Sequence, residues 1–312
     1  MIDSVTARSA VGNLRSCASI LGRGISQIYF QSNIWCGLLI LAAFATADWR
    51  MAVLVLLVLL GAASSTVAGV LLRLRWDEIN VGFHGFCGAL VGAASFAALG
   101  AGWAGVAATV AGGAACSPVA VGVARLFSIP GLKQFNLPVT TAPFCIVAGL
   151  IYWLTTPLRP GAALPAPTDA TVLQGFGRSL LTNVSQVVLV DSAVAGALIL
   201  LGLFIASWKV GVAALFGSAL ESLVALVTGQ ELDSLYHGLL GYCGVLTAIA
   251  LAVIFLKGTW QPWVAAVVGV VLSTPLAYLL HATAIPVYTW PYILATWMVL
   301  VAVKFIPGFR RR

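Results

Sequence analysis

The chain carries the stretch LPVTTAPF at Leu137–Phe144 and, 148 residues later, the related stretch IPVYTWPY at Ile285–Tyr292. Each has two prolines five residues apart with a threonine between them, inside apolar sequence long enough to cross a bilayer. Proline lacks an N–H donor and crowds the carbonyl four residues earlier, so the second proline of each copy should free the carbonyl of Val139 or Val287. At membrane depth such a break needs surrounding protein or a water-filled cavity. Two matched breaks therefore predict a binding site between two halves of a membrane protein.

The composition indicates a polytopic membrane protein. Hydrophobic residues make up 61% of the 312, charged residues only 8%, and the mean hydropathy is +1.05, whereas a soluble domain has about 25% charged residues. No large hydrophilic segment and no cleavable signal peptide are evident. Six scattered cysteines lack paired spacing, so we expect buried thiols, and we predict no metal and no cofactor. The net charge of +7 fits a basic membrane-facing surface, and we predict no nucleic-acid partner.

Ten apolar runs predict ten membrane-spanning helices, five in each half of the chain. The charged segment Arg73–Glu78 interrupts them, and the stretch that follows, up to Phe83, is too short to cross, so it is predicted to be a re-entrant half-helix. The predicted spans are residues 33–47, 51–72, 84–100, 103–124, 142–156, 192–208, 210–228, 237–256, 263–280 and 290–306.

The second half repeats the first. Ser26–Ile28 corresponds to Ser185–Val187, GFCGAL at residues 85–90 to GYCGVL at 241–246, Ser117-Pro118 to Thr274-Pro275, and the double-proline stretch closes both halves. The offsets are 159, 156, 157 and 148 residues. Because five spans per half is an odd number, the two halves should have opposite orientations.

These observations predict an all-α integral membrane protein with two inverted-topology repeats of five transmembrane helices each, and a re-entrant half-helix in the first repeat. The expected segments are an N-terminal cytoplasmic or interfacial segment (1–25), the first repeat (26–157), an extracytoplasmic linker rich in proline and alanine (158–182), the second repeat (183–306) and a basic cytoplasmic tail (307–312). If both termini are cytoplasmic, 13 of the 16 basic residues lie inside and three lie outside. This distribution favours a multi-pass protein of the cell (inner) membrane with both termini in the cytoplasm.

Thr141 and Thr289 offer hydroxyl oxygens beside the carbonyls of Val139 and Val287. Such a column of acceptors suits a neutral solute with several N–H donors. Ions fit less well, because no ring of carboxylates and no cluster of positive charge is visible to replace a hydration shell.

The motif L-P-x-x-T-x-P-F, intact at residues 137–144 and relaxed at 285–292, resembles that of the urea transporters, and the order of the shared segments fits residues 26–306. The resemblance implies a homotrimer in membrane lipid with one central pore per protomer, and five transmembrane helices plus a re-entrant half-helix in each repeat. It also implies urea or a similar small neutral solute as the transported partner. The residues it implies are Phe30, Phe86 and Leu90 in a first slot, Leu189, Tyr242 and Leu246 in a second, Gln27 and Gln186 at the slots, and Thr141 and Thr289 at the centre.

Some residues depart from the family pattern. Cys87 and Cys243 stand where the family usually has asparagine, and Leu189 replaces an aromatic wall. A small amide or ammonia therefore remains open as the solute.

The predicted function is channel-like facilitated diffusion of urea. An ion- or proton-coupled transporter of a small neutral solute is the alternative, and it needs ionisable groups at the substrate site. Glu221 is an acid at membrane depth, for which a partnered structural carboxylate is the competing interpretation. An enzyme is not predicted, because no Ser/His/Asp set, catalytic acid pair or metal cluster is found.

Overall fold

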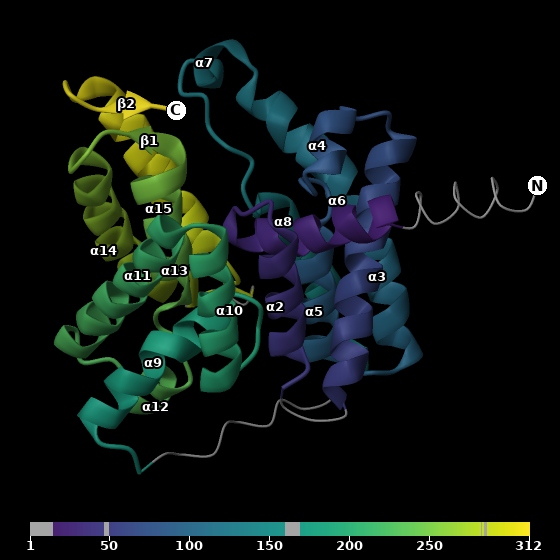
Figure 1. Ribbon diagram of the computed structural model, residues 1–312, viewed down its shortest axis with the longest axis horizontal. Helices are drawn as coiled ribbons and strands as arrows, with labels where there is room; N and C mark the ends of the chain where they lie inside the picture. The colour runs from purple at the N-terminus through teal and green to yellow at the C-terminus, as the bar shows by residue number, and fades with distance from the viewer. Residues whose placement is uncertain (1–14, 47–49, 160–168, 282, 284–285) are drawn as a thin grey trace, which may run out of the picture.

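The computed structural model describes residues 15–46, 50–159, 169–281, 283 and 286–312, and about three quarters of them are helical (Figure 1). The segment 1–14, residues 160–168 of the predicted linker and Ile285 of the second motif lie outside the described residues. A helical fold follows from the chain's apolar runs, because within lipid a helix satisfies its own backbone polar groups.

The first half, residues 15–158, opens with a helical segment, Arg15–Tyr29, that ends in the 3-10 turn η1 (Gln27–Tyr29). It continues with α2 (Ile34–Phe44), α3 (Arg50–Leu71), α4 (Trp76–Asn80), α5 (Phe86–Leu99), α6 (Trp103–Phe127), α7 (Pro130–Lys133), α8 (Ala142–Leu154) and η2 (Thr156–Leu158).

The second half, residues 169–312, contains α9 (Val172–Gln186), α10 (Ala193–Ala206), α11 (Trp208–Val227), α12 (Leu232–Tyr236), α13 (Tyr242–Ala248), the π-helix η3 (Ile249–Phe255), α14 (Gln261–His281), α15 (Trp290–Ala302) and η4 (Val303–Phe305). The strands β1 (Leu256–Lys257) and β2 (Arg310–Arg311) pair antiparallel.

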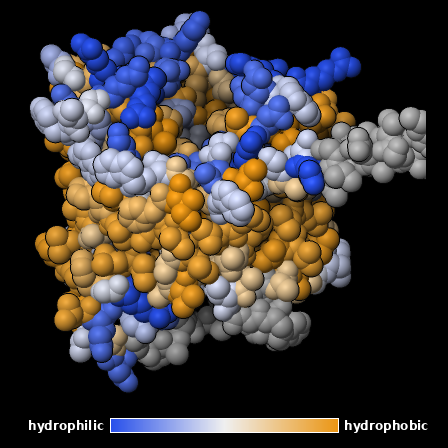
Figure 2. All heavy atoms as spheres, viewed as in Figure 1, coloured by the Kyte–Doolittle hydropathy of each residue, from blue (hydrophilic) through white to orange (hydrophobic). Residues whose placement is uncertain are grey.

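Among the described residues, four helices are long and apolar enough to cross a membrane: α3, α6, α11 and α14. The bent pair Arg15–Tyr29 and Ile34–Phe44, with an angle of 77°, adds a fifth if it forms one span. Figure 2 shows a broad apolar band between two hydrophilic ends, as expected for a protein surrounded by lipid. The chain is therefore an all-α, multi-pass membrane protein, and each of the other predicted spans coincides with a shorter apolar helix.

The predicted linker 158–182 is wrong beyond Thr171, because α9 begins at Val172 with a capping box formed by Thr171 and Gln174. The sequence of α9 is polar enough to look like a linker, but its polar face is buried against α11. Ser179 Oγ lies 2.9 Å from Ser222 Oγ, and Asn183 Nδ2 donates to Ser218 Oγ at 3.0 Å. The boundary predicted at residue 25 also falls inside a helix, where Ile25 is fully buried.

The two halves repeat the same close contacts between helices. A Cβ added to Gly61 of α3 would lie 2.1 Å from the carbonyl oxygen of Gly88 in α5. A Cβ added to Gly217 of α11 would lie 2.1 Å from the carbonyl oxygen of Gly244 in α13. Only glycine allows main chains to approach this closely, so the glycines fix how α5 packs on α3 and how α13 packs on α11.

The halves also contact each other directly. The Tyr29 hydroxyl, fully buried, donates to the carbonyl of Val184 at 2.6 Å, and a Cβ on Gly202 of α10 would meet the Cα of Cys36 in α2 at 3.3 Å. In Figure 1, α4 lies near the top and its counterpart α12 near the bottom.

Candidate functional site

The double-proline stretches start helices and do not interrupt them. Pro143 lies in the first turn of α8 and Pro291 in the first turn of α15, where a missing N–H leaves no helical hydrogen bond unmade. The prediction of freed carbonyls is therefore wrong: Val139 O accepts from Ala142 N at 3.3 Å, and Val287 O accepts from Trp290 N at 3.1 Å. Each carbonyl oxygen still has a second lone pair for another donor.

The chain reaches these helix starts through residues with left-handed backbone. Thr140 has φ of 52° and Tyr288 has φ of 39°, and each directly precedes the threonine that the sequence analysis singled out. These two turns bring Thr141 and Thr289, each only 3% exposed, into direct contact. Their Oγ1 atoms are 2.7 Å apart, and Cys145 Sγ lies 3.1 Å from the Thr289 hydroxyl.

A cavity of about 290 Å³, which we call the first vestibule, lies on one side of this threonine pair. Phe30 forms part of its wall and meets Phe255 and Tyr292 edge-on at centroid distances of 5.7 and 6.3 Å. Ile254, Phe255 and Tyr292 were not predicted as lining residues. The predicted residues that line it are Gln27, Phe30, Phe86, Val139 and Thr141.

A second cavity of about 430 Å³, the second vestibule, is lined by residues from both halves. Leu189 and Val287, both predicted, lie in its wall. Tyr152, Tyr288 and a group of alanines from α5 were not predicted; the alanines are Ala94, Ala97 and Ala98.

The structure leaves several predicted residues outside the two vestibules. Leu90 and Leu246 are packed in the core with 1% exposure each. Tyr242 donates its hydroxyl to the carbonyl of Tyr288 at 2.7 Å and lines a separate cavity. Thr289 lines neither vestibule, but it contacts Thr141, which lines the first.

The two predicted glutamines make equivalent contacts, one in each half. Gln27 Nε2 donates to the carbonyl of Val81 at 3.0 Å, and Gln186 Nε2 donates to the carbonyl of His237 at 2.8 Å. Each glutamine therefore ties the end of one helix to the turn that follows a short helix, α4 or α12.

A polar cluster at the second of these turns has no match in the first half. Asp191 pairs with His237 Nδ1 and with Arg178, whose NH2 lies 3.3 Å from Asp191 Oδ1. At the equivalent place in the first half, the Ser32 hydroxyl donates to the carbonyl of Val81 at 3.1 Å.

The predicted basic tail contacts two other segments of the chain. Strand β2 pairs with β1, and Arg311 donates to the carbonyls of Phe135 and Asn136, the latter at 2.7 Å. Partial burial lowers the pKa of Arg311, but a guanidinium stays charged at any physiological pH. These bonds fasten the tail to the loop that leads into the first motif.

One sequence signal could have found the missed walls. The offset of 156 residues pairs Ile254 with Ala98. Ile254 lines the first vestibule, whose other residues come mainly from the first half, and Ala98 lines the second vestibule, whose other residues come mainly from the second half. The C-terminal end of α5 and the segment η3, which continues α13, therefore each line the cavity that is formed mainly by the other half.

The chain is similar to known transport proteins. The family model described as Urea transporter matches residues 18–304. Urea transporter 1 of Ovis aries is 27% identical over 296 residues, covering 89% of this chain and 75% of the relative. Urea transporter 1 of Rattus norvegicus is 26% identical over 309 residues, covering 93% of this chain and 78% of the relative. The chain, with its two matched threonine motifs meeting between two vestibules, belongs to the urea transporter family.

Proposed function

We propose that this chain is a channel-like facilitator that lets urea cross the membrane down its gradient. The observation that carries the proposal is the hydrogen bond between Thr141 and Thr289, with a vestibule on either side. The family match and the relatives named Urea transporter 1 support urea as the solute. Because the family is one of transporters, the chain is not an enzyme.

The chemistry of the path suits urea. Aromatic walls such as Phe30 and Phe255 can cover the flat faces of the molecule. At the centre, the two threonine hydroxyls can exchange their mutual hydrogen bond for bonds to the solute's N–H groups and carbonyl. A neutral hydrogen bond is worth about 1 kcal/mol net, so this exchange is a small barrier, and no charge has to leave water.

A coupled transporter is not favoured. Among the described residues that line the two vestibules there is no Asp, Glu, Lys or Arg, and the histidine in the second, His281, has its Nδ1 2.8 Å from the carbonyl of Ala277. Coupling to an ion or a proton would need such groups at the solute's binding site. The presence of Cys87 and Cys243 beside the path keeps small amides and ammonia as further candidate solutes.

We propose that the two halves are inverted repeats of five spans and a half-helix. The caps that follow α4 and α12, Val81 and His237, have the same backbone angles, φ of −83° and ψ of 1°. Phe30 and Leu189 also match, with φ of 60° and 61°. The opposite heights of α4 and α12 in Figure 1 support the inversion.

The assembly and location are part of the same proposal. A homotrimer rests on the family resemblance, and the distribution of 13 basic residues against three supports cytoplasmic termini in the inner membrane. The proposed repeats end at residues 157 and 306, and each begins with the helix that carries its glutamine, Arg15–Tyr29 in the first and α9 in the second.

The test is stopped-flow light scattering on proteoliposomes. Urea flux should depend only on the urea gradient, and an imposed pH gradient or voltage should leave it unchanged. The double variant Thr141→Val/Thr289→Val should lower the flux, while Thr155→Val at the end of α8, which is not among the residues that line either vestibule, should not. Flux driven by a proton gradient, or a double variant that assembles and conducts normally, would contradict the proposal.

A further inference from the structure

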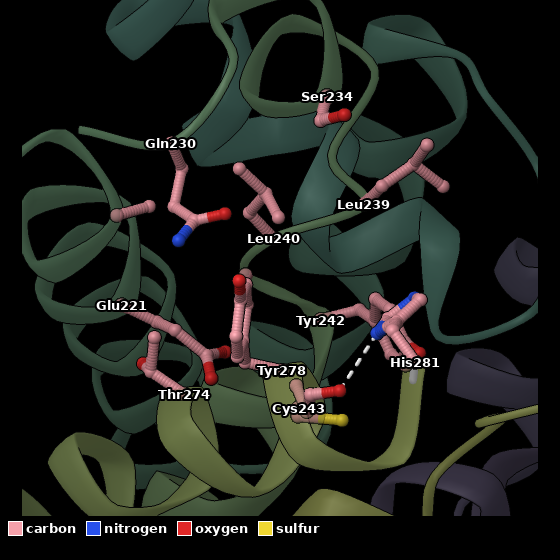
Figure 3. A pocket seen from close by; sticks show the side chains of 13 residues that line it. Glu221, Gln230, Ser234, Leu239, Leu240, Tyr242, Cys243, Thr274, Tyr278 and His281 are labelled. Atoms are coloured by element: carbon pink, nitrogen blue, oxygen red, sulfur yellow. Dashed lines mark hydrogen bonds between the residues drawn. The ribbon is translucent and has the colours of Figure 1, made fainter. Parts of the chain in front are cut away.

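The second half contains a third cavity, which among the described residues shares only His281 with the second vestibule. It has a volume of about 280 Å³ and lies between α11, the turn after α12, the start of α13 and the end of α14. Figure 3 shows Glu221 reaching into it from α11, with Thr274 and Tyr278 from α14. A buried acid, Glu221, is among the residues that line it.

Glu221 is 2% exposed and only partly satisfied. Its Oε1 accepts from the Ser273 hydroxyl at 2.6 Å, and its Oε2 accepts from the backbone N–H of Gly244. A carboxylate offers about four acceptor positions, so about two remain. No ion pair joins Glu221 to a basic side chain of the described residues.

Two other groups that line the cavity can also accept a hydrogen bond. Thr274 Oγ1 is buried without a hydrogen-bond partner among the described residues. His281 Nδ1 lies 2.8 Å from the carbonyl of Ala277. If that nitrogen carries the proton, Nε2 is an acceptor. The cavity thus presents a carboxylate and neutral acceptors together with the rings of Tyr242 and Tyr278.

The first half contains neither the acid nor the space. At the equivalent place, Ser65 and Ser117 form the hydrogen bonds, with the Ser117 hydroxyl donating to Ser65 O at 2.7 Å. The neighbouring cavity is only about 10 Å³, because Phe83 and His84 stand where the second half has Leu239 and Leu240. Charge and room occur together in one half, which indicates a ligand more than a packing fault.

We propose that this cavity binds a small organic cation with N–H donors, of the size of guanidinium or methylammonium. The Glu221 carboxylate supplies the countercharge, because a buried charge without a partner is costly. Thr274 accepts one of the N–H groups, and the tyrosine rings cover the cation's faces. The site does not include the contact between Thr141 and Thr289, and the binding that we propose there does not depend on transport.

The test is equilibrium binding of radiolabelled guanidinium to the purified full-length protein at constant ionic strength set with sodium chloride. Binding should saturate at one cation per chain. Glu221→Gln should weaken it at least tenfold and Thr274→Val severalfold, while Ser117→Ala, the matched change in the first half, should leave it unchanged.

Excess urea should not displace the cation. Displacement by urea would place the cation in the pore and overturn the proposal, as would unchanged binding in Glu221→Gln. If Glu221→Gln fails to fold, Thr274→Val and Tyr278→Leu carry the test, since Tyr278 is 70% exposed and its loss should not affect folding. Unchanged binding in both of these variants would also overturn the proposal.

Discussion

The two halves of the chain share their backbone path much more closely than their side chains. Phe30 and Leu189 have nearly the same φ, although one is aromatic and the other is not. In the first half, a hydrogen bond between Ser117 and Ser65 joins α6 to α3. In the second half, a hydrogen bond between Ser273 and the Glu221 carboxylate joins α14 to α11. The two halves therefore share their turns and helix contacts. Their side chains differ, so the space between α3 and α6 is nearly filled, whereas the equivalent space between α11 and α14 is a cavity.

The largest expected effect comes from the shared backbone contacts. Gly61→Val and Gly217→Val should each prevent stable folding, because a side chain would meet a carbonyl oxygen at 2.1 Å, and overpacking costs about 1–3 kcal/mol or more. Size-exclusion profiles and thermal unfolding check this. Gly122→Ala in α6, with nothing within 4 Å of the added Cβ, is the matched control and should be neutral.

The glycine result also bears on the equivalence of the halves. If one of the two valine variants folded normally and the other did not, the halves would not depend equally on these contacts.

Next in size is a difference between the two central threonines. Thr289→Val removes a hydroxyl that contacts both Thr141 and Cys145, whereas Thr141→Val leaves Thr289 with Cys145 as a partner. Urea flux should fall about tenfold in Thr289→Val, as expected for more than one lost hydrogen bond of about 1 kcal/mol, and less in Thr141→Val. The rate constants of osmotic re-swelling measure both. Equal losses would mean that the Cys145 contact has no role.

The glutamines should behave alike in the two halves. Gln27→Met and Gln186→Met each remove a donor to a main-chain carbonyl, so each should lower urea flux about fivefold, the equivalent of one hydrogen bond. Flux from vesicles of known protein content is the measurement. A loss in one variant alone would show that the halves differ in function at the pore mouths.

The smallest effect is expected at the polar cluster of the second half. Asp191→Asn should lower the free energy of unfolding by less than about 1 kcal/mol, because a partly exposed ion pair is screened by water. The difference should shrink at high salt, as thermal unfolding in low and high sodium chloride would show. Ser32→Ala, the matched change, should show no such salt dependence.

Much of the fold could be predicted from the sequence, because uninterrupted apolar runs leave the backbone few choices in lipid. All ten predicted spans coincide with helices. The start of α9 was missed because its polar face, with Ser179 and Asn183, is buried against polar positions of α11, which a hydropathy pattern cannot distinguish from a linker.

The candidate site was predicted in part. The meeting of Thr141 and Thr289 follows from the duplication, but the role of the prolines was misjudged, because sequence alone does not distinguish a broken helix from a helix that starts inside the membrane. The correspondence of Ser117 with Thr274 agrees with the register of the prolines that follow them, Pro118 inside α6 and Pro275 inside α14, although the serine that makes the hydrogen bond in the second half is Ser273. The vestibule walls contributed by the opposite half depend on tertiary packing that no local pattern records.

The hydrogen bond between the two threonines has a consequence for the temperature dependence of transport. Opening it and replacing it with bonds to the solute leaves the number of hydrogen bonds nearly constant, so little enthalpy should be needed at the narrowest point. Urea flux through this chain should therefore rise only weakly on warming, close to the behaviour of diffusion in water.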